Sequence, residues 1–302
     1  MKKSHGALCA SLLIVVSCKK IERRVSEYRM RASKADLSAQ VELDKLPPTG
    51  CSLPQPRPAM VTLEAVDGRG LRRKFDVLPP SSLSPRAEMA LTFVFHAAGG
   101  TAKSAEAMGL QNVPGASNSI FVFPEGIEYE QGKGWDDACS GSDMVFFDRM
   151  LVIIRNRFCV DPKRVFAAGF SWGADFVTAL LCCRGDLLRA AAPASCSDEF
   201  SNPANPKSYA NYPCPRPSRA AIRFTHDANG DEYYTKAQFQ TTRRLYGEWN
   251  GCDSSVAAEL NNPCVRYEGC RTPLIACAYV GIGHSIPASW ASETWAFFSK
   301  FQ

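Results

Sequence analysis

The sequence is poor in histidine and has no long hydrophobic run beyond its first residues. Histidine occurs only at positions 5, 96, 226 and 284 of 302. After the N-terminal stretch, no segment approaches the roughly 18 apolar residues of a membrane-spanning helix. No C-x-x-C pair is present, and no histidine stands near the cysteines at the spacing of zinc ligands. We therefore expect no bound metal and no organic cofactor.

The sequence also has no large excess of basic or acidic residues. The formal net charge is +5, and removal of residues 1–17, which hold two lysines and no acid, would leave +3. A charge of this size does not point to nucleic acid or an acidic polymer as a partner. In residues 19–46 acidic side chains interleave with basic ones, so we interpret this stretch as a solvated tether rather than a nucleic-acid-binding arm.

The N-terminus carries the pattern of an export signal. Lys2 and Lys3 precede an apolar stretch at residues 7–17, which is too short to span a membrane. The sequence Val15-Val16-Ser17-Cys18 resembles a bacterial lipobox, which implies cleavage before Cys18 and lipidation of its thiol. The alternative is an ordinary signal peptide that is cut nearby. A multiply acylated Cys18 would anchor the protein at a membrane surface, and nothing else predicts membrane contact.

Three segments follow from this organisation. We predict a lipoprotein signal peptide at residues 1–17, a charged tether at 18–50 and one α/β domain at 51–302. Pro-Pro-Thr-Gly at 47–50 ends the tether.

Cysteine is abundant. Of 13 cysteines, Cys9 would leave with the signal and Cys18 would carry lipid, so eleven remain. With an export signal, this density predicts disulfides, and the odd number leaves at least one thiol. The spacing does not reveal the connectivity. A redox pair formed by Cys182 and Cys183 is a poor alternative, because adjacent helical cysteines are badly placed to bridge each other.

One stretch has the pattern of a nucleophile elbow. Residues 165–168 are apolar and predict a buried strand, Gly-Phe-Ser-Trp-Gly follows at 169–173, and residues 174–181 predict a helix. Strand, tight turn and helix form the context that a G-x-S-x-G elbow requires. Glycines on both sides of Ser171 remove side chains that would collide, and the helix N-terminus favours negative charge near the serine oxygen.

The rest of the domain alternates strands with helices. A hairpin is predicted at residues 60–66 and 73–78, buried strands at 91–95, 119–124, 188–193, 220–226 and 274–280, and helices at 143–158, 239–249 and 290–301. This order predicts an α/β-hydrolase fold, a doubly wound, mostly parallel sheet with helices on both faces and several disulfides.

A base and an acid follow the nucleophile in the chain order of that fold. His284 stands in a glycine-rich turn after the last predicted strand and is the candidate base. Asp227 and Asp231 both follow the strand at 220–226. We prefer Asp231, because the Asn-Gly turn before it would deliver it towards His284, whereas Asp227 is better placed to hold that turn. Asp227 remains the alternative acid.

An oxyanion hole and an aromatic subsite can also be predicted. The strand at 91–95 runs into His-Ala-Ala-Gly-Gly at 96–100, so the backbone amides of Ala97 or Ala98 and of Trp172 are candidate oxyanion donors. Trp135 and Trp290 are candidates for substrate binding, although each is equally credible as a core residue.

These stretches resemble a known family. The matching segments are 73–79, 96–100, 143–148, 159–173, 249–252, 267–270 and 281–284. In this order they resemble secreted carbohydrate esterases of the feruloyl esterase and polyhydroxybutyrate depolymerase group. The resemblance implies Ser171 as nucleophile, His284 as base and an acid near Asp231. The chain departs from the family at Ala97, where glycine is usual, and at Trp172, where a smaller or more polar residue is common.

Together these features predict an exported or surface-anchored serine carboxylic-ester hydrolase. Its substrate would be a small or polymeric ester, either a feruloyl or acetyl polysaccharide ester or a polyhydroxybutyrate-type ester. We expect a monomer. The alternative function is a catalytically silent, polymer-binding surface lipoprotein with the same fold.

Overall fold

The computed structural model describes residues 49–52, 59–80, 88–130, 132–196, 220–261 and 263–302. These residues belong to a compact unit, Pro47–Gln302. The predicted signal peptide at 1–17, Cys18 and nearly all of the tether at 18–50 lie outside the described residues and stay predictions. Within the described ranges, no helix has the length and apolar character needed to cross a membrane.

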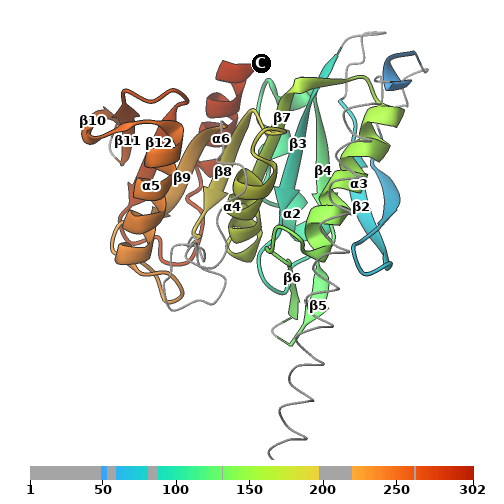
Figure 1. Ribbon diagram of the computed structural model, residues 1–302, viewed down its shortest axis with the longest axis horizontal. Helices are drawn as coiled ribbons and strands as arrows, with labels where there is room; N and C mark the ends of the chain where they lie inside the picture. Colours follow the sequence, from blue (N-terminus) through green and yellow to red (C-terminus); the bar gives the residue numbers. More distant parts are fainter. Residues whose placement is uncertain (1–48, 53–58, 81–87, 131, 197–219, 262) are drawn as a thin grey trace, which may run out of the picture. The chain divides into compact units, whose positions relative to one another are not determined.

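A single large sheet forms the centre of the unit (Figure 1). Among the described residues it has ten strands, in the order β1 (Val61–Val66), β2 (Arg72–Leu78), β4 (Ser119–Pro124), β3 (Met89–Phe95), β7 (Val160–Phe170), β8 (Ala190–Ala194), β9 (Ala221–Asp227), β12 (Leu274–Tyr279), β11 (Cys264–Glu268) and β10 (Asp253–Asn261). From β4 to β12 neighbouring strands are parallel, whereas the pairs at both edges are antiparallel. The predicted hairpin at 60–66 and 73–78 is present as β1 and β2.

The interior strands are apolar because both of their faces are covered. Every residue of β3 and β4 is buried. In contrast, β1 alternates between more and less exposed positions along most of its length, as an edge strand with one covered face does. The continuous apolar runs of the sequence therefore correspond to the strands that lie between two layers of helices.

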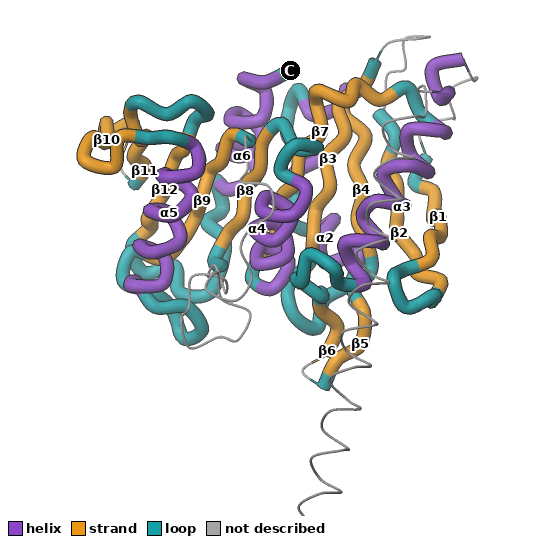
Figure 2. Tube along the Cα trace, in the orientation of Figure 1, coloured by secondary structure: helices purple, strands orange, loops and turns teal. Residues whose placement is uncertain are grey.

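Helices cover both faces of the sheet (Figure 2). On one face lie α3 (Ser142–Arg157), α4 (Trp172–Arg184) and α5 (Lys236–Asn250), and the ring of Phe93 packs 4.9 Å from that of Phe147 on α3. On the other lie α2 (Ala102–Glu106) and α6 (Trp290–Phe298), where Phe166 stacks on Phe298 at 4.7 Å. The sheet is thus the middle of three layers.

Two parts of the fold were not predicted from the sequence. The strands β10 and β11 extend the sheet beyond β12. A small hairpin of β5 (Ile127–Tyr129) and β6 (Gly132–Gly134) lies where no strand was predicted. All residues of β11 are at least partly exposed, so its sequence lacks the apolar run of a buried strand. The strands β5 and β6 have three residues each, which is too few to show a period of alternation.

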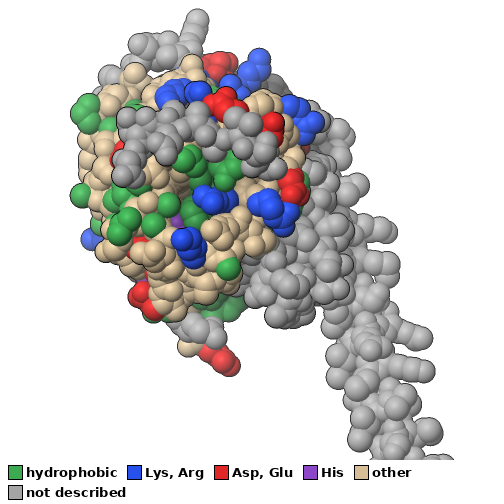
Figure 3. Space-filling model, turned by 90° about the vertical axis from the view of Figure 1, so that its left-hand side faces the viewer, with side chains coloured by type: hydrophobic (Ala, Val, Ile, Leu, Met, Phe, Trp, Pro, Cys, Tyr) green, Lys and Arg blue, Asp and Glu red, His purple; other side chains and the backbone are tan. Residues whose placement is uncertain are grey.

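On the surface beside β10 and α5, the described residues form no large patch of side chains of one charge. Hydrophobic, basic and acidic side chains are interspersed there (Figure 3). A mixed surface of this kind agrees with the small net charge of the chain.

Disulfides tie distant parts of the fold together, as predicted. The described pairs are Cys51–Cys159, Cys139–Cys183, Cys252–Cys270 and Cys264–Cys277, and Cys182 is disulfide-bonded as well. The first pair closes 108 residues of sequence, and bridges of this kind typically stabilise a fold by ~2–4 kcal/mol. Cys196 is a buried thiol just after β8.

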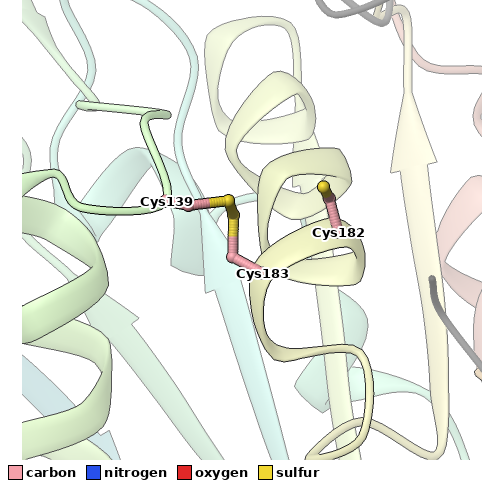
Figure 4. A group of neighbouring side chains, drawn as sticks. All are labelled: Cys139, Cys182 and Cys183. Atoms are coloured by element: carbon pink, nitrogen blue, oxygen red, sulfur yellow. A yellow bond between two sulfur atoms is a disulfide. The ribbon is translucent and has the colours of Figure 1, made fainter. Parts of the chain in front are cut away.

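Three sulfur atoms gather beside α4. Those of Cys139, Cys182 and Cys183 lie within 4.8 Å of one another, a spacing that thiolates around a metal ion also have. Figure 4 shows the bond between Cys139 and Cys183, with the side chain of Cys182 separate from it. Because all three sulfurs take part in disulfides, none of them is a thiolate that could ligate a metal.

Candidate active site

Ser171 occupies the sharp turn between β7 and α4. Its φ of 54° and ψ of −127° lie in a region that residues with side chains rarely adopt. A Cβ on Gly169 would lie 2.5 Å from the carbonyl oxygen of Gly173, and a Cβ on Gly173 would lie 2.4 Å from that of Phe95. Both glycines are therefore required for the strand and helix to approach each other here.

Two further side chains line up with this serine. The Nε2 atom of His284 lies 2.7 Å from Oγ of Ser171, and its Nδ1 atom lies 3.0 Å from Oδ2 of Asp231. The three residues follow β7, β9 and β12, which are parallel and end at the same edge of the sheet. The structure thus brings together the serine, histidine and preferred acid of the sequence analysis.

A tight turn at residues 229–235, here called the acid turn, carries Asp231. Gly230 has a φ of 84° and pairs with Thr235 across the turn. Oδ1 of Asp231 accepts hydrogen bonds from the backbone amides of Tyr233 and Tyr234, both at 2.8 Å. Burial raises the pKa of Asp231, but hydrogen bonds from His284 and from these two amides outweigh it and hold the pKa below its usual value. The carboxylate therefore stays ionised beside the imidazole.

Asp227 has a different position. Its Oδ1 accepts from the amide of Asn229 at 2.8 Å, and its Oδ2 accepts from the amide of Gly283 at 2.9 Å. Burial raises the pKa of Asp227, whereas backbone hydrogen bonds from Asn229, Gly283 and Ile282 lower it by more. Asp227 thus fixes the start of the acid turn and the turn before His284, and its carboxylate faces backbone amides.

The loop after β3 is held close to the elbow. Nε2 of His96 accepts from the amide of Gly126 at 2.9 Å, and its Nδ1 donates to the carbonyl of Ala97 at 2.8 Å. Burial lowers the pKa of His96, so the ring is neutral and can make both contacts. The indole N–H of Trp135 donates to the carbonyl of His96 at 2.9 Å. These bonds fix the backbone that carries the predicted oxyanion donors.

Known proteins resemble this chain in sequence. No family model matches the chain. Over 232 residues it is 28% identical to feruloyl esterase B of Piromyces equi, covering 70% of this chain but 42% of that protein. It is 23% identical over 282 residues to feruloyl esterase D of Neurospora crassa, covering 84% and 91%. The chain thus spans less than half the length of the Piromyces relative.

Solved structures show the fold. An acetyl xylan esterase from Aspergillus awamori superposes with a TM-score of 0.62 at 16% identity, covering 79% of this chain and 99% of that one. A ferulic acid esterase superposes with a TM-score of 0.52 at 15% identity, covering 82% and 97%. The chain therefore has the α/β-hydrolase fold of these esterases, as predicted.

A pocket opens at Ser171. Its volume is about 590 Å³, and it is lined by Ala97, Ala98, Phe170, Ser171, Trp172, Asp175, Tyr233, Tyr234 and His284. The three predicted oxyanion residues are therefore on its wall. Phe170 and Tyr233 place their rings 5.0 and 4.5 Å from the ring of His284, and Tyr233 is 67% exposed.

Four lining residues were missed by the sequence analysis. They are Phe170, Asp175, Tyr233 and Tyr234. Asp175 lies in the first turn of α4, one turn after the elbow serine, and the two tyrosines directly follow the acid turn's Asp231 and Glu232. Their closeness to the predicted serine and acid in the sequence was the available signal.

Trp135 and Trp290, the two candidate substrate-binding tryptophans, lie in the core instead. Each is only 1% exposed, and neither lines the pocket. Trp135 packs edge-on against Phe95 at 5.1 Å, and Trp290 belongs to the apolar cluster beneath α6. Burial of these wide indole rings removes more apolar surface from water than a place on the pocket wall would.

Proposed function

We propose that the chain is a serine carboxylic-ester hydrolase with Ser171 as nucleophile, His284 as general base and Asp231 as the acid of the triad. The observation that carries this proposal is the unbroken line of hydrogen bonds from Asp231 through His284 to a serine on a strained elbow. The three residues follow separate strands, and packing of the core by itself does not require hydrogen bonds between them.

The first half-reaction uses these contacts directly. His284 Nε2 takes the proton of Ser171 as Oγ attacks the ester carbonyl carbon. Asp231, whose pKa is lowered, remains anionic, holds the proton on Nδ1 and stabilises the imidazolium that forms. His284 then gives its proton to the departing alcohol, which leaves an acyl group on Ser171.

The oxyanion faces the pocket wall. The backbone amides of Trp172 and of Ala97 or Ala98 are the donors, and the N-terminus of α4 favours negative charge at this place. Loss of one such donor typically costs ~3–4 kcal/mol of transition-state stabilisation. In the second half-reaction His284 deprotonates a water molecule, whose oxygen attacks the acyl carbonyl carbon. The bond from that carbon to Oγ of Ser171 then breaks, Oγ takes the proton back from His284, and the carboxylic acid is released.

Aromatic rings favour a planar acyl group. Phe170, Trp172, Tyr233 and Tyr234 all line the pocket and offer ring faces or edges for stacking. The curated relatives are feruloyl esterases, and the solved neighbours include an acetyl xylan esterase. We therefore favour hydroxycinnamoyl esters of a polysaccharide as substrates, ahead of acetyl or hydroxybutyryl esters.

Export to an oxidising compartment belongs to the same proposal. The disulfides of the domain agree with it, because such bonds persist outside the reducing cytosol. Lipidation at Cys18 would then keep the enzyme at a membrane surface. The complete line of serine, histidine and acid speaks against a catalytically silent binding protein.

Labelling with a fluorophosphonate and hydrolysis of an ester panel test the proposal together. We expect the probe to modify Ser171, and feruloyl esters to be cleaved faster than acetyl and hydroxybutyryl esters. Ser171→Ala should abolish labelling and lower kcat by about 10⁶-fold, with an unchanged thermal melt. A wild-type protein that neither reacts with the probe nor cleaves any ester would refute the proposal and favour the binding protein.

A further inference from the structure

Tyr234 touches three parts of the site at once. Its backbone amide donates to Oδ1 of Asp231 at 2.8 Å, and its ring centroid lies 5.6 Å from that of His284. Its phenol hydroxyl donates to Oδ2 of Asp175 at 2.7 Å. This last bond joins the acid turn to the helix that begins at the nucleophile, across 59 residues of sequence.

Asp175 is fixed relative to Ser171. Its amide donates to the carbonyl of Ser171 at 3.0 Å, and the residue is only 5% exposed. A carboxylate at this depth requires hydrogen-bond donors, and the phenol of Tyr234 is one of them. The hydrogen bond from Tyr234 therefore ends on a residue that is itself held next to Ser171.

The phenol remains protonated and can keep this bond across the working pH range. Burial and then the charge of Asp175 raise the pKa of Tyr234 far above its ordinary value. The nearby side chain of Ser171 lowers this pKa, but by less than burial and Asp175 raise it. Tyr234, Ser171 and Asp175 all line the same pocket.

We propose that Tyr234 is a positioning residue that, through Asp175, keeps the acid turn and His284 aligned with Ser171. This inference rests on the proposed function. The acid turn protrudes far enough that Tyr233 is largely exposed, so a direct bond to α4 limits its movement. Small displacements of catalytic groups have large effects, since a shift of ~1 Å can cost ~10²-fold in rate.

Tyr234→Phe isolates the hydroxyl, because the variant keeps the ring and the backbone amide that Asp231 accepts from. We expect kcat to fall by about 10- to 100-fold while KM stays within about twofold. The rate of inactivation by a fluorophosphonate should fall by the same factor. A raised KM with an unchanged kcat would overturn the proposal, because Tyr234 would then be a substrate contact.

Variants of Asp175 test the other end of the bond. Asp175→Asn keeps an oxygen that can accept from the phenol and should retain most of the activity, whereas Asp175→Ala should lose as much as Tyr234→Phe. The double variant of Asp175→Ala and Tyr234→Phe should be no worse than either single change. Fully additive losses would contradict a shared role.

Tyr246→Phe is the matched control. Its hydroxyl donates to the carbonyl of Thr178 at 2.9 Å, so the variant also removes a phenol bond to α4, at a buried place that does not line the pocket. We expect its kcat to equal that of the wild type. An equal drop in both tyrosine variants would assign the effect to general loosening of α4 and overturn the proposal.

A spectroscopic measurement separates this inference from the proposed function. The Nδ1 proton that His284 shares with Asp231 can be followed by NMR in the ligand-free protein, whether or not any ester is cleaved. In Tyr234→Phe this resonance should broaden through faster exchange with water, and in Tyr246→Phe it should not. An unchanged resonance in Tyr234→Phe would reject the positioning role even for a protein that proves to be an esterase.

Discussion

Asp227 and Asp231 both follow β9, yet only Asp231 contacts His284. Asp231 accepts from the imidazole at 3.0 Å, whereas Asp227 accepts from backbone amides, including that of Gly283 next to the histidine. The Asn-Gly turn between the two acids reverses the chain, so the second carboxylate points back towards the sheet edge. Two similar residues thus have separate positions that can be tested separately.

Asp231→Asn should lower kcat by about 10³- to 10⁴-fold, because an amide cannot stabilise the imidazolium or hold the correct tautomer. Asp227→Asn should mainly lower the free energy of unfolding, by about 1–3 kcal/mol, because part of its backbone hydrogen bonding is lost. Steady-state kinetics and denaturant melts of the two variants, side by side, check both statements. The reverse pattern would assign the triad acid to Asp227.

The two tryptophans nearest the site should respond in opposite ways. Trp135→Phe removes the indole N–H that donates to the carbonyl of His96, and we expect about 1 kcal/mol lower stability with KM within about twofold. Trp172→Ala removes a ring from the pocket wall and should raise KM for aryl esters instead. A raised KM in Trp135→Phe, measured on folded protein, would return Trp135 to the substrate subsite.

His226 should make the fold sensitive to mild acid. It is fully buried, stacks on Phe239 at 4.4 Å, and neither ring nitrogen has a hydrogen-bond partner among the described residues. Burial lowers its pKa, although the charges of Asp231 and Asp227 partly oppose this. Below the unfolded-state pKa of about 6.5, the unfolded chain takes up a proton that the folded ring resists, so stability falls as the pH drops.

His226→Phe removes this titration while keeping a ring against Phe239. The slope of unfolding free energy against pH, measured by urea melts between about pH 7.5 and 5, should therefore be shallower in the variant. Some slope should remain, because burial also lowers the pKa of His96. Identical slopes in the two proteins would contradict this, because they would show that His226 has the same pKa in the folded and the unfolded chain.

Short-range patterns in the sequence were enough to predict the elbow and the interior strands. Gly169 and Gly173 are needed because strand and helix approach within contact of bare backbone, and the apolar runs of β3 and β4 reflect burial on both faces. The order of serine, acid and histidine could also be read directly, because parallel strands bring their carboxyl ends to one edge.

Side-chain partners across the sheet were decided only by the tertiary structure. The sequence left Asp227 and Asp231 as alternatives, because the direction of each carboxylate depends on how the turn at Gly230 closes. It could not pair Tyr234 with Asp175, because a hydrogen bond between a turn and a distant helix leaves no periodic trace.

Disulfide pairing and the burial of the tryptophans were also decided only by the tertiary structure. Disulfide pairing and the burial of Trp135 depend on which segments meet in space, and cysteine spacing or an aromatic side chain by itself is compatible with several answers. Local backbone sterics and the period of burial therefore determined where Ser171 stands, whereas long-range packing decided which groups hold it in place.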